Sequence, residues 1–133
     1  MIRFKLIIIW VMCLFITHDS ISQTPNEVLL ELRNQNIKYP KIVLAQSLLE
    51  TGRFSCTTCS MDANNLFGLR NVKENKWFHF NTWQESIGGY KRMIEYRYNE
   101  KNYNNYYDFL DKIGYAVDPN YINKLKSIVN KIK

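Results

Sequence analysis

Residues 40–52 read PKIVLAQSLLETG, and this run carries a helix start, an apolar face and a helix end. Pro40 suits the first turn of a helix, where the amide proton that proline lacks is not needed. Gly52 lies where the end of a helix favours a residue of left-handed conformation. The apolar side chains between them cluster on one side of the predicted helix: Ile42, Ala45, Leu48 and Leu49. We therefore predict a helix that begins at Pro40 and ends shortly before Gly52.

Glu50 falls in the last turn of this helix and is a candidate general acid. The unpaired carbonyl groups at a helix C-terminus carry a partial negative charge, which disfavours an ionised carboxylate. Leu48 and Leu49 can also exclude water, so both effects favour a protonated glutamate near neutral pH. By helical spacing Glu50 lines up with Val43 and Gln46 at the edge of the apolar face. A solvated glutamate at a helix end is the simpler interpretation of that spacing.

Capping signals predict further helices on both sides of this run. Residues 24–27 read TPNE, a capping box with proline at the first helical position. Thr82 and Glu85 have the spacing of a second capping box. Residues at helical spacing follow it: Trp83, Ile87, Tyr90, Ile94 and Arg97.

The C-terminal part of the chain contains signals for two more helices. Residues 106–113 read as a short helix that Gly114 ends. Asp118 and Pro119 are predicted to cap the last helix. The apolar face of that helix consists of Ile122, Leu125, Ile128, Val129 and Ile132.

Residues 69–82 interrupt the helical pattern. Residues 77–80 read WFHF, rich in rings that favour strands, and residues 73–75 suit a turn before them. We therefore predict a small β-hairpin. The expected fold class is mainly α (α+β), one compact helical domain over residues 23–133 with a minor β-lobe.

Residues 1–22 are expected to be a secretory signal peptide. Arg3 and Lys5 precede an apolar run over residues 6–16, and small side chains near Ser22 suit cleavage after that residue. The run has eleven residues, whereas roughly 20 are needed to span a bilayer. We expect an exported protein, periplasmic or secreted, with no stable membrane anchor after cleavage.

The charge balance favours an anionic partner outside the cell. Removal of Arg3, Lys5 and Asp19 lowers the formal charge from +6 to +5. A basic exported protein is attracted to anionic surfaces, and peptidoglycan, with its peptide carboxylates, is one such surface in a bacterial envelope. Export argues against nucleic acid as the partner. The high aromatic share, 14%, fits either a filled core or a groove lined with rings.

Cys56 and Cys59 form a C-x-x-C pair in the segment after Glu50. Outside the cytoplasm this spacing favours a disulfide, and so small a ring restrains little chain entropy. Its expected role is to hold the loop beside Glu50. A zinc site would need two more ligands, and His79 is the only histidine after residue 22. We expect neither a metal nor a cofactor.

Four blocks of sequence carry a resemblance to a known family. They are IVLAQSLLETG at residues 42–52, NNLFGLR at residues 64–70, Glu85-Ser86 with Tyr90, and GYAVDPNY at residues 114–121 with Leu125. In this order they resemble the bacterial glucosaminidases of glycoside hydrolase family 73, which include autolysins. The resemblance implies a lysozyme-like fold with a β-lobe. It also implies peptidoglycan glycan strands as substrate and hydrolysis of the β-1,4 bond after N-acetylglucosamine.

The resemblance also implies roles for single residues. It assigns the family's catalytic glutamate to Glu50 and its conserved tyrosine to Tyr115. The phenol of Tyr115 is expected to hydrogen-bond the sugar or position a water, or else to pack against the helix end. Asn64 fits a turn residue equally well. The residues expected to bind the glycan are Gln46, Asn64, Asn65, Phe67 and Tyr121.

The β-lobe of this chain is shorter than in most members of the family, where that lobe supplies a second carboxylate. Glu74 is the only acid between Leu69 and Trp83, and a charged turn residue is the simpler interpretation of it. As a base, Glu74 would stand roughly 6.5–9.5 Å from Glu50 for inversion, or about 5–5.5 Å for a retaining route. Without a second acid, the N-acetyl group of the substrate can act as nucleophile.

Three functions remain open from the sequence. The leading one is an endo-acting N-acetylglucosaminidase that works as a monomer on peptidoglycan. The second is a muramidase or lytic transglycosylase that cuts the other glycan bond. The third is a wall-binding module that holds glycan without cleaving it.

Overall fold

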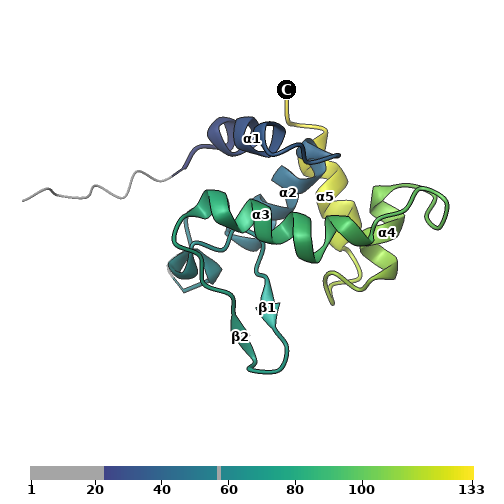
Figure 1. The fold of residues 1–133 in the computed structure, drawn as a ribbon. Helices are drawn as coiled ribbons and strands as arrows, with labels where there is room; N and C mark the ends of the chain where they lie inside the picture. Colours follow the sequence, from purple (N-terminus) through teal and green to yellow (C-terminus); the bar gives the residue numbers. More distant parts are fainter. Residues whose placement is uncertain (1–22, 57) are drawn as a thin grey trace, which may run out of the picture.

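The computed structural model describes residues 23–56 and 58–133, so the expected signal peptide lies outside the described residues. Figure 1 shows helices gathered into one body, from which a short hairpin projects. The elements in chain order are α1 (Pro25–Asn34), α2 (Pro40–Glu50), η1 (Ser60–Ala63), β1 (Arg70–Asn71), β2 (Lys76–Trp77), α3 (Trp83–Met93), η2 (Glu95–Arg97), α4 (Tyr106–Lys112) and α5 (Tyr121–Val129). The mainly α fold class with a truncated β-lobe, as expected for a lysozyme-like domain, is confirmed. In this described part, no helix has the length and apolar character to cross a membrane.

Helix α1 begins as the sequence predicts. The Thr24 hydroxyl accepts a hydrogen bond from the Glu27 N–H at 3.3 Å, and the Glu27 carboxylate accepts one from the Thr24 N–H at 2.7 Å. Both bonds of the capping box are therefore present, and they satisfy amide groups that the helix leaves unpaired.

Helix α2 is the central helix and packs against α1 and α5 (Figure 1). It begins at Pro40 and ends at Glu50, and Gly52 has a left-handed φ of +54°, as predicted. The expectation of one apolar face is wrong, because every residue from Val43 to Leu48 is buried. A helix enclosed by its neighbours buries polar side chains as well.

Helix α3 begins at its predicted cap and ends earlier than the spacing suggests. The Thr82 hydroxyl accepts from the Glu85 N–H at 3.3 Å, whereas the Glu85 carboxylate bonds the N–H of Asn81. The helix ends at Met93, so Arg97 lies in η2. Tertiary contact accounts for the change of direction, since the Glu95 carboxylate in η2 accepts a hydrogen bond from the Lys38 N–H at 3.1 Å.

The last helix begins later than predicted. Asp118 does not cap α5, because its carboxylate accepts from the Asn120 N–H at 2.9 Å and its carbonyl from the Tyr121 N–H at 3.0 Å. These bonds form a turn of the kind that aspartate favours. Helix α5 then begins at Tyr121 without a side-chain cap. The predicted end of α4 is confirmed, with Gly114 at a φ of +64°.

The hairpin pairs only two residues on each strand, with Arg70 opposite Trp77. The turn falls at residues 72–75 and contains the predicted turn at residues 73–75. The strand predicted over residues 77–80 is shorter and lies at Lys76–Trp77. Phe80 lies outside the ladder and packs on α3, where a Cβ at Gly89 would stand 2.7 Å from the Phe80 ring. Only glycine fits there, so the shortened lobe is anchored directly to the helical body.

Most of the aromatic side chains fill the core. The largest buried rings are Tyr90, Tyr106, Phe67 and Phe109. Tyr106 stacks on Tyr39 with ring centroids 4.8 Å apart, and Tyr98 meets both rings edge to face. The many aromatic side chains of this sequence therefore mainly pack the core, and fewer of them line a groove.

Candidate active site

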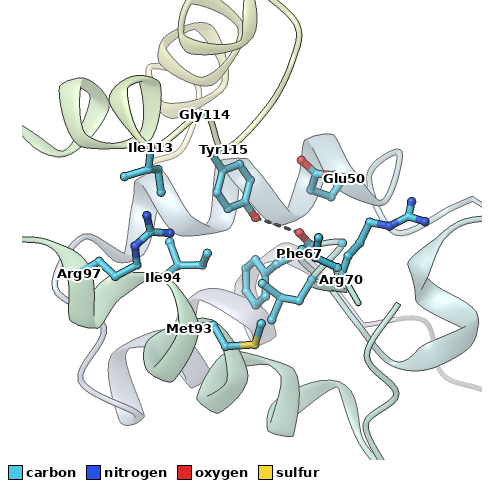
Figure 2. Close-up of a pocket in the computed structure, with 12 residues that line it drawn as sticks. Glu50, Phe67, Arg70, Met93, Ile94, Arg97, Ile113, Gly114 and Tyr115 are labelled. Carbon is cyan, nitrogen blue, oxygen red and sulfur yellow. Dashed lines mark hydrogen bonds between the residues drawn. The ribbon is translucent and has the colours of Figure 1, made fainter. Parts of the chain in front are cut away.

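One cavity of about 370 Å³ opens beside the end of α2 (Figure 2). Its walls come from that helix end, the segment leading into the hairpin, the junction of α3 with η2, and the turn after α4. The lining residues are Glu50, Phe67, Gly68, Leu69, Arg70, Val72, Met93, Ile94, Arg97, Ile113, Gly114 and Tyr115. Glu50 is the only carboxylic acid among them.

Glu50 is half-buried on the cavity wall and does not project into bulk solvent. Burial raises the pKa of its carboxyl above the ordinary value, because removal of water disfavours the charged form. The hydroxyl of Tyr121 donates a hydrogen bond to Glu50 Oε1 at 3.4 Å and partly opposes that rise in pKa. The net effect is a pKa above the ordinary glutamate value, which is the direction of change that suits a general acid.

The backbone at Gly68 approaches the carboxyl of Glu50 from the side of the hairpin. A Cβ built at Gly68 would stand 3.0 Å from Glu50 Oε2, and the residue has a left-handed φ of +61°. Both the close approach and the left-handed φ favour glycine, because a larger residue would crowd the carboxyl and strain the backbone. Glu50 is therefore restrained on one side by Tyr121 and on the other by Gly68.

Asn65 organises the turn that contains Gly68. Its Nδ2 donates to the carbonyls of Leu69 (2.8 Å) and Phe78 (3.0 Å), and its Oδ1 accepts from the N–H groups of Phe67 and Leu69. The side chain is 0% exposed. The polar atoms of Asn65 are engaged inside the protein, and its contact with the glycan stays a prediction.

Tyr115 lines the cavity and its hydroxyl donates to the carbonyl of Phe67 at 2.9 Å. Burial raises the pKa of this phenol well above its ordinary value, so it stays protonated near neutral pH. Its ring stacks on that of Tyr121, with centroids 5.7 Å apart. Tyr115 thus joins the turn after α4 to the hairpin side of the cavity, and its ring rather than its proton is presented to a ligand.

Gln46 lies one helical turn before Glu50 and is 0% exposed. Its Oε1 accepts from the hydroxyl of Tyr90 at 2.6 Å, and that hydroxyl is 2.7 Å from the one on Tyr106. Its Nε2 makes no hydrogen bond within the described structure. Burial raises the pKa of Tyr121, and the nearby Gln46 amide opposes that rise. Gln46 therefore lies in the protein interior beneath Glu50, and its contact with the glycan stays a prediction.

A family profile described as mannosyl-glycoprotein endo-beta-N-acetylglucosaminidase matches residues 26–133. The chain belongs to the glucosaminidase family. A comparison with curated proteins finds no significant match. Family membership supports a glycoside hydrolase that acts on a glycan of the peptidoglycan type.

Three other predicted site residues do not line the cavity: Asn64, Tyr121 and Glu74. Asn64 donates from its side chain to the carbonyls of Phe80 (3.0 Å) and Asn81 (3.2 Å). Tyr121 is only 7% exposed, and its hydroxyl contacts Glu50 from the protein interior. Glu74 is exposed in the hairpin turn and is absent from the cavity wall. The short lobe places Glu74 outside the cavity, and its role as a second carboxylate stays a prediction.

The glucosaminidase domain contains a disulfide between Cys56 and Cys59, with Cα atoms 5.9 Å apart. A Cβ at Gly52 would lie 3.7 Å from the Cβ of Cys56, so the small ring packs against the residue that ends α2. Within residues 23–56 and 58–133, no three His, Cys, Asp or Glu side chains gather as metal ligands would.

Several residues that line the cavity were not predicted from the sequence. Gly68 was visible only as part of the NNLFGLR block, and Arg97 only as a position in a helical repeat. Arg70 reaches across the hairpin to Asn75, with 3.1 Å to its carbonyl and 3.0 Å to its side-chain oxygen, and its guanidinium lies over the Trp77 ring. No local pattern signals that the two arginines share one cavity.

Proposed function

We propose that this glucosaminidase hydrolyses the β-1,4 bond after N-acetylglucosamine in peptidoglycan, with Glu50 as the general acid. The observation that carries the proposal is a single carboxyl on the cavity wall, half-buried and with a pKa that burial raises. Gly68 and Tyr121 hold this carboxyl in place. General acids in hydrolases commonly owe a raised pKa to such burial.

Glu50 gives its proton to the glycosidic oxygen as the bond from that oxygen to C1 breaks. Because the cavity wall holds no second carboxyl, the N-acetyl carbonyl oxygen of the substrate attacks C1 and forms a cyclic intermediate. A water then opens this ring, and the ionised Glu50 accepts the proton of that water. The protonated carboxyl is thereby restored and the sugar keeps its anomeric configuration.

A lytic transglycosylase is the second candidate, favoured by the same single carboxyl. Such an enzyme cuts after N-acetylmuramic acid and closes an anhydro ring on that sugar. Borohydride reduction of digested sacculi followed by mass spectrometry separates the two. Reduced glucosamine ends support the proposal, whereas anhydro-muramic or reduced muramic ends contradict it.

The role of Glu50 is tested by a zymogram of Glu50→Gln on peptidoglycan. General acid catalysis contributes typically 10²–10⁴-fold, so a loss of at least about a hundredfold is expected. Glu74→Gln is the matched control and should retain activity. Unchanged cleavage by Glu50→Gln would remove Glu50 from the mechanism. No cleavage by the wild-type protein would favour a wall-binding module.

We also propose that the protein works as a monomer outside the cytoplasm, in the periplasm or beyond. The signal-like residues 1–22 and a disulfide support export. Cell fractionation and size-exclusion chromatography of the mature protein test these two points. A cytoplasmic pool of full-length chain, or a dimer at micromolar concentration, would contradict them.

A further inference from the structure

Arg97 is a cation on the cavity wall without a partner in the described part of the chain. It is exposed, lies in η2 and lines the same cavity as Glu50 (Figure 2). No hydrogen bond or ion pair joins its guanidinium to any described residue. Its charge is therefore available to a ligand that enters the cavity.

The acid nearest to Arg97 in sequence faces elsewhere. Glu95 belongs to the same short turn, but it is only 7% exposed and its carboxylate accepts from the Lys38 N–H. Because Glu95 is directed toward the start of α2, it leaves the charge of Arg97 uncompensated.

Arg70 lines the opposite side of the cavity, but its guanidinium extends away from Tyr115 toward the hairpin. Figure 2 shows Arg70 and Arg97 on either side of the space in front of Tyr115. Arg70 is held by Asn75 and stacked over Trp77, whereas Arg97 has no such restraint. Arg97 therefore supplies the unrestrained positive charge on the cavity wall, and this charge suits the cavity to an anionic ligand.

We propose that Arg97 binds a carboxylate of the peptidoglycan substrate and makes the cavity prefer anionic glycans to neutral ones. This inference rests on the proposed function. The shared chemistry is a carboxylate, supplied either by the stem peptide or by the lactyl group of muramic acid once that peptide is removed. The planar guanidinium of arginine matches a carboxylate with two parallel hydrogen bonds.

The test measures dissociation constants and does not require turnover. Glu50→Gln serves as the background, and Arg97→Gln is added to it. Three soluble tetrasaccharides are compared: one with stem peptides, one after amidase treatment with only lactyl carboxylates, and one whose carboxyls are converted to methylamides. Arg33→Gln, an exposed arginine outside the cavity, is the control for net charge.

Loss of Arg97 is expected to weaken binding about tenfold for a carboxylate-bearing glycan and to leave the methylamide unchanged. A loss confined to the first tetrasaccharide identifies the stem peptide, and a loss on the second identifies the lactyl group. The affinity of Arg97→Lys for a carboxylate-bearing glycan should lie between the affinities of the parent protein and of Arg97→Gln. Lysine keeps the positive charge but lacks the planar guanidinium that forms two parallel hydrogen bonds. Equal loss on all three glycans, no loss on any, or no binding of any glycan overturns the inference. Absence of cleavage by the wild-type protein would instead overturn the proposed function alone.

Discussion

Glu50 is subject to two opposing influences at the scale of single residues. Burial raises its pKa, and the hydrogen bond from Tyr121 lowers it. A raised pKa keeps the acid protonated to a higher pH, so activity should fall as pH rises through that pKa. The alkaline limb of the pH–rate profile is therefore the observable that reports on this carboxyl.

Tyr121→Phe should move that alkaline limb to higher pH. The substitution removes a donor to the charged form of Glu50 and leaves the desolvation in place, so the pKa of Glu50 rises further. The measurement is kcat/KM across pH on solubilised peptidoglycan. Tyr96→Phe, an exposed ring, is the control and should leave the limb where it is. A limb that stays in place or moves to lower pH would contradict this account.

At the scale of elements, the turn before the hairpin places Gly68, with its left-handed backbone, against the carboxyl of Glu50. Gly68→Ala would force a Cβ to within 3.0 Å of Glu50 Oε2 and would also strain a left-handed backbone. We expect a loss of about tenfold or more in kcat, and a decrease of about 1–2 kcal/mol in the free energy of unfolding.

The Gly114→Ala variant distinguishes the effect of backbone strain from the effect of contact with Glu50 in Gly68→Ala. Gly114 has a similar φ of +64°, and a Cβ there meets nothing within 4 Å. A comparable fall in stability with a smaller fall in kcat is expected, measured by urea unfolding and steady-state kinetics. Equal losses of kcat in both variants would mean that backbone strain alone explains Gly68.

The disulfide after α2 is expected to act locally. Cys56 and Cys59 are only three residues apart, so the double serine variant should lose no more than about 2 kcal/mol of unfolding free energy. Urea unfolding of the oxidised protein and of the variant measures this. A much larger loss would show that the bond organises more than the loop beside α2.

Local signals explain which elements the sequence predicts well. The capping box at Thr24, the turn before Lys76 and the glycine after α4 all depend on neighbours within four residues. The predicted end of α3 and the predicted start of α5 were wrong. The first depends on the bond of Glu95 to Lys38, which is distant in sequence, and the second on a turn that Asp118 makes in place of a cap.

At the scale of the whole molecule, buried polar groups connect three helices beneath the cavity. Gln46 of α2, Tyr90 of α3 and Tyr106 of α4 form one hydrogen-bonded chain. Such a network in a dry core holds its members in one arrangement, because an unmet polar group there is costly. The network fixes α2, which carries Glu50, relative to α3 and α4.

Gln46→Leu and Tyr90→Phe should each lower the free energy of unfolding by about 1–3 kcal/mol. Combined, they should lose less than the sum of the single losses, with a coupling of about 1 kcal/mol. Urea unfolding of the four proteins in the cycle measures this. Gln46→Leu combined with Tyr96→Phe is the control and should be additive. Additivity in the first pair would contradict the network.

The sequence by itself determined the starts of α1, α2, α3 and α4, the hairpin turn, the family and the position of Glu50 at a helix end. These depend on residues close together in the chain, or on blocks of fixed order. Only the tertiary structure decided that Gln46 and Asn65 are buried, that Arg97 faces the cavity and that Gly68 approaches Glu50. The physical reason is that burial and a shared cavity arise from contacts between residues far apart in sequence.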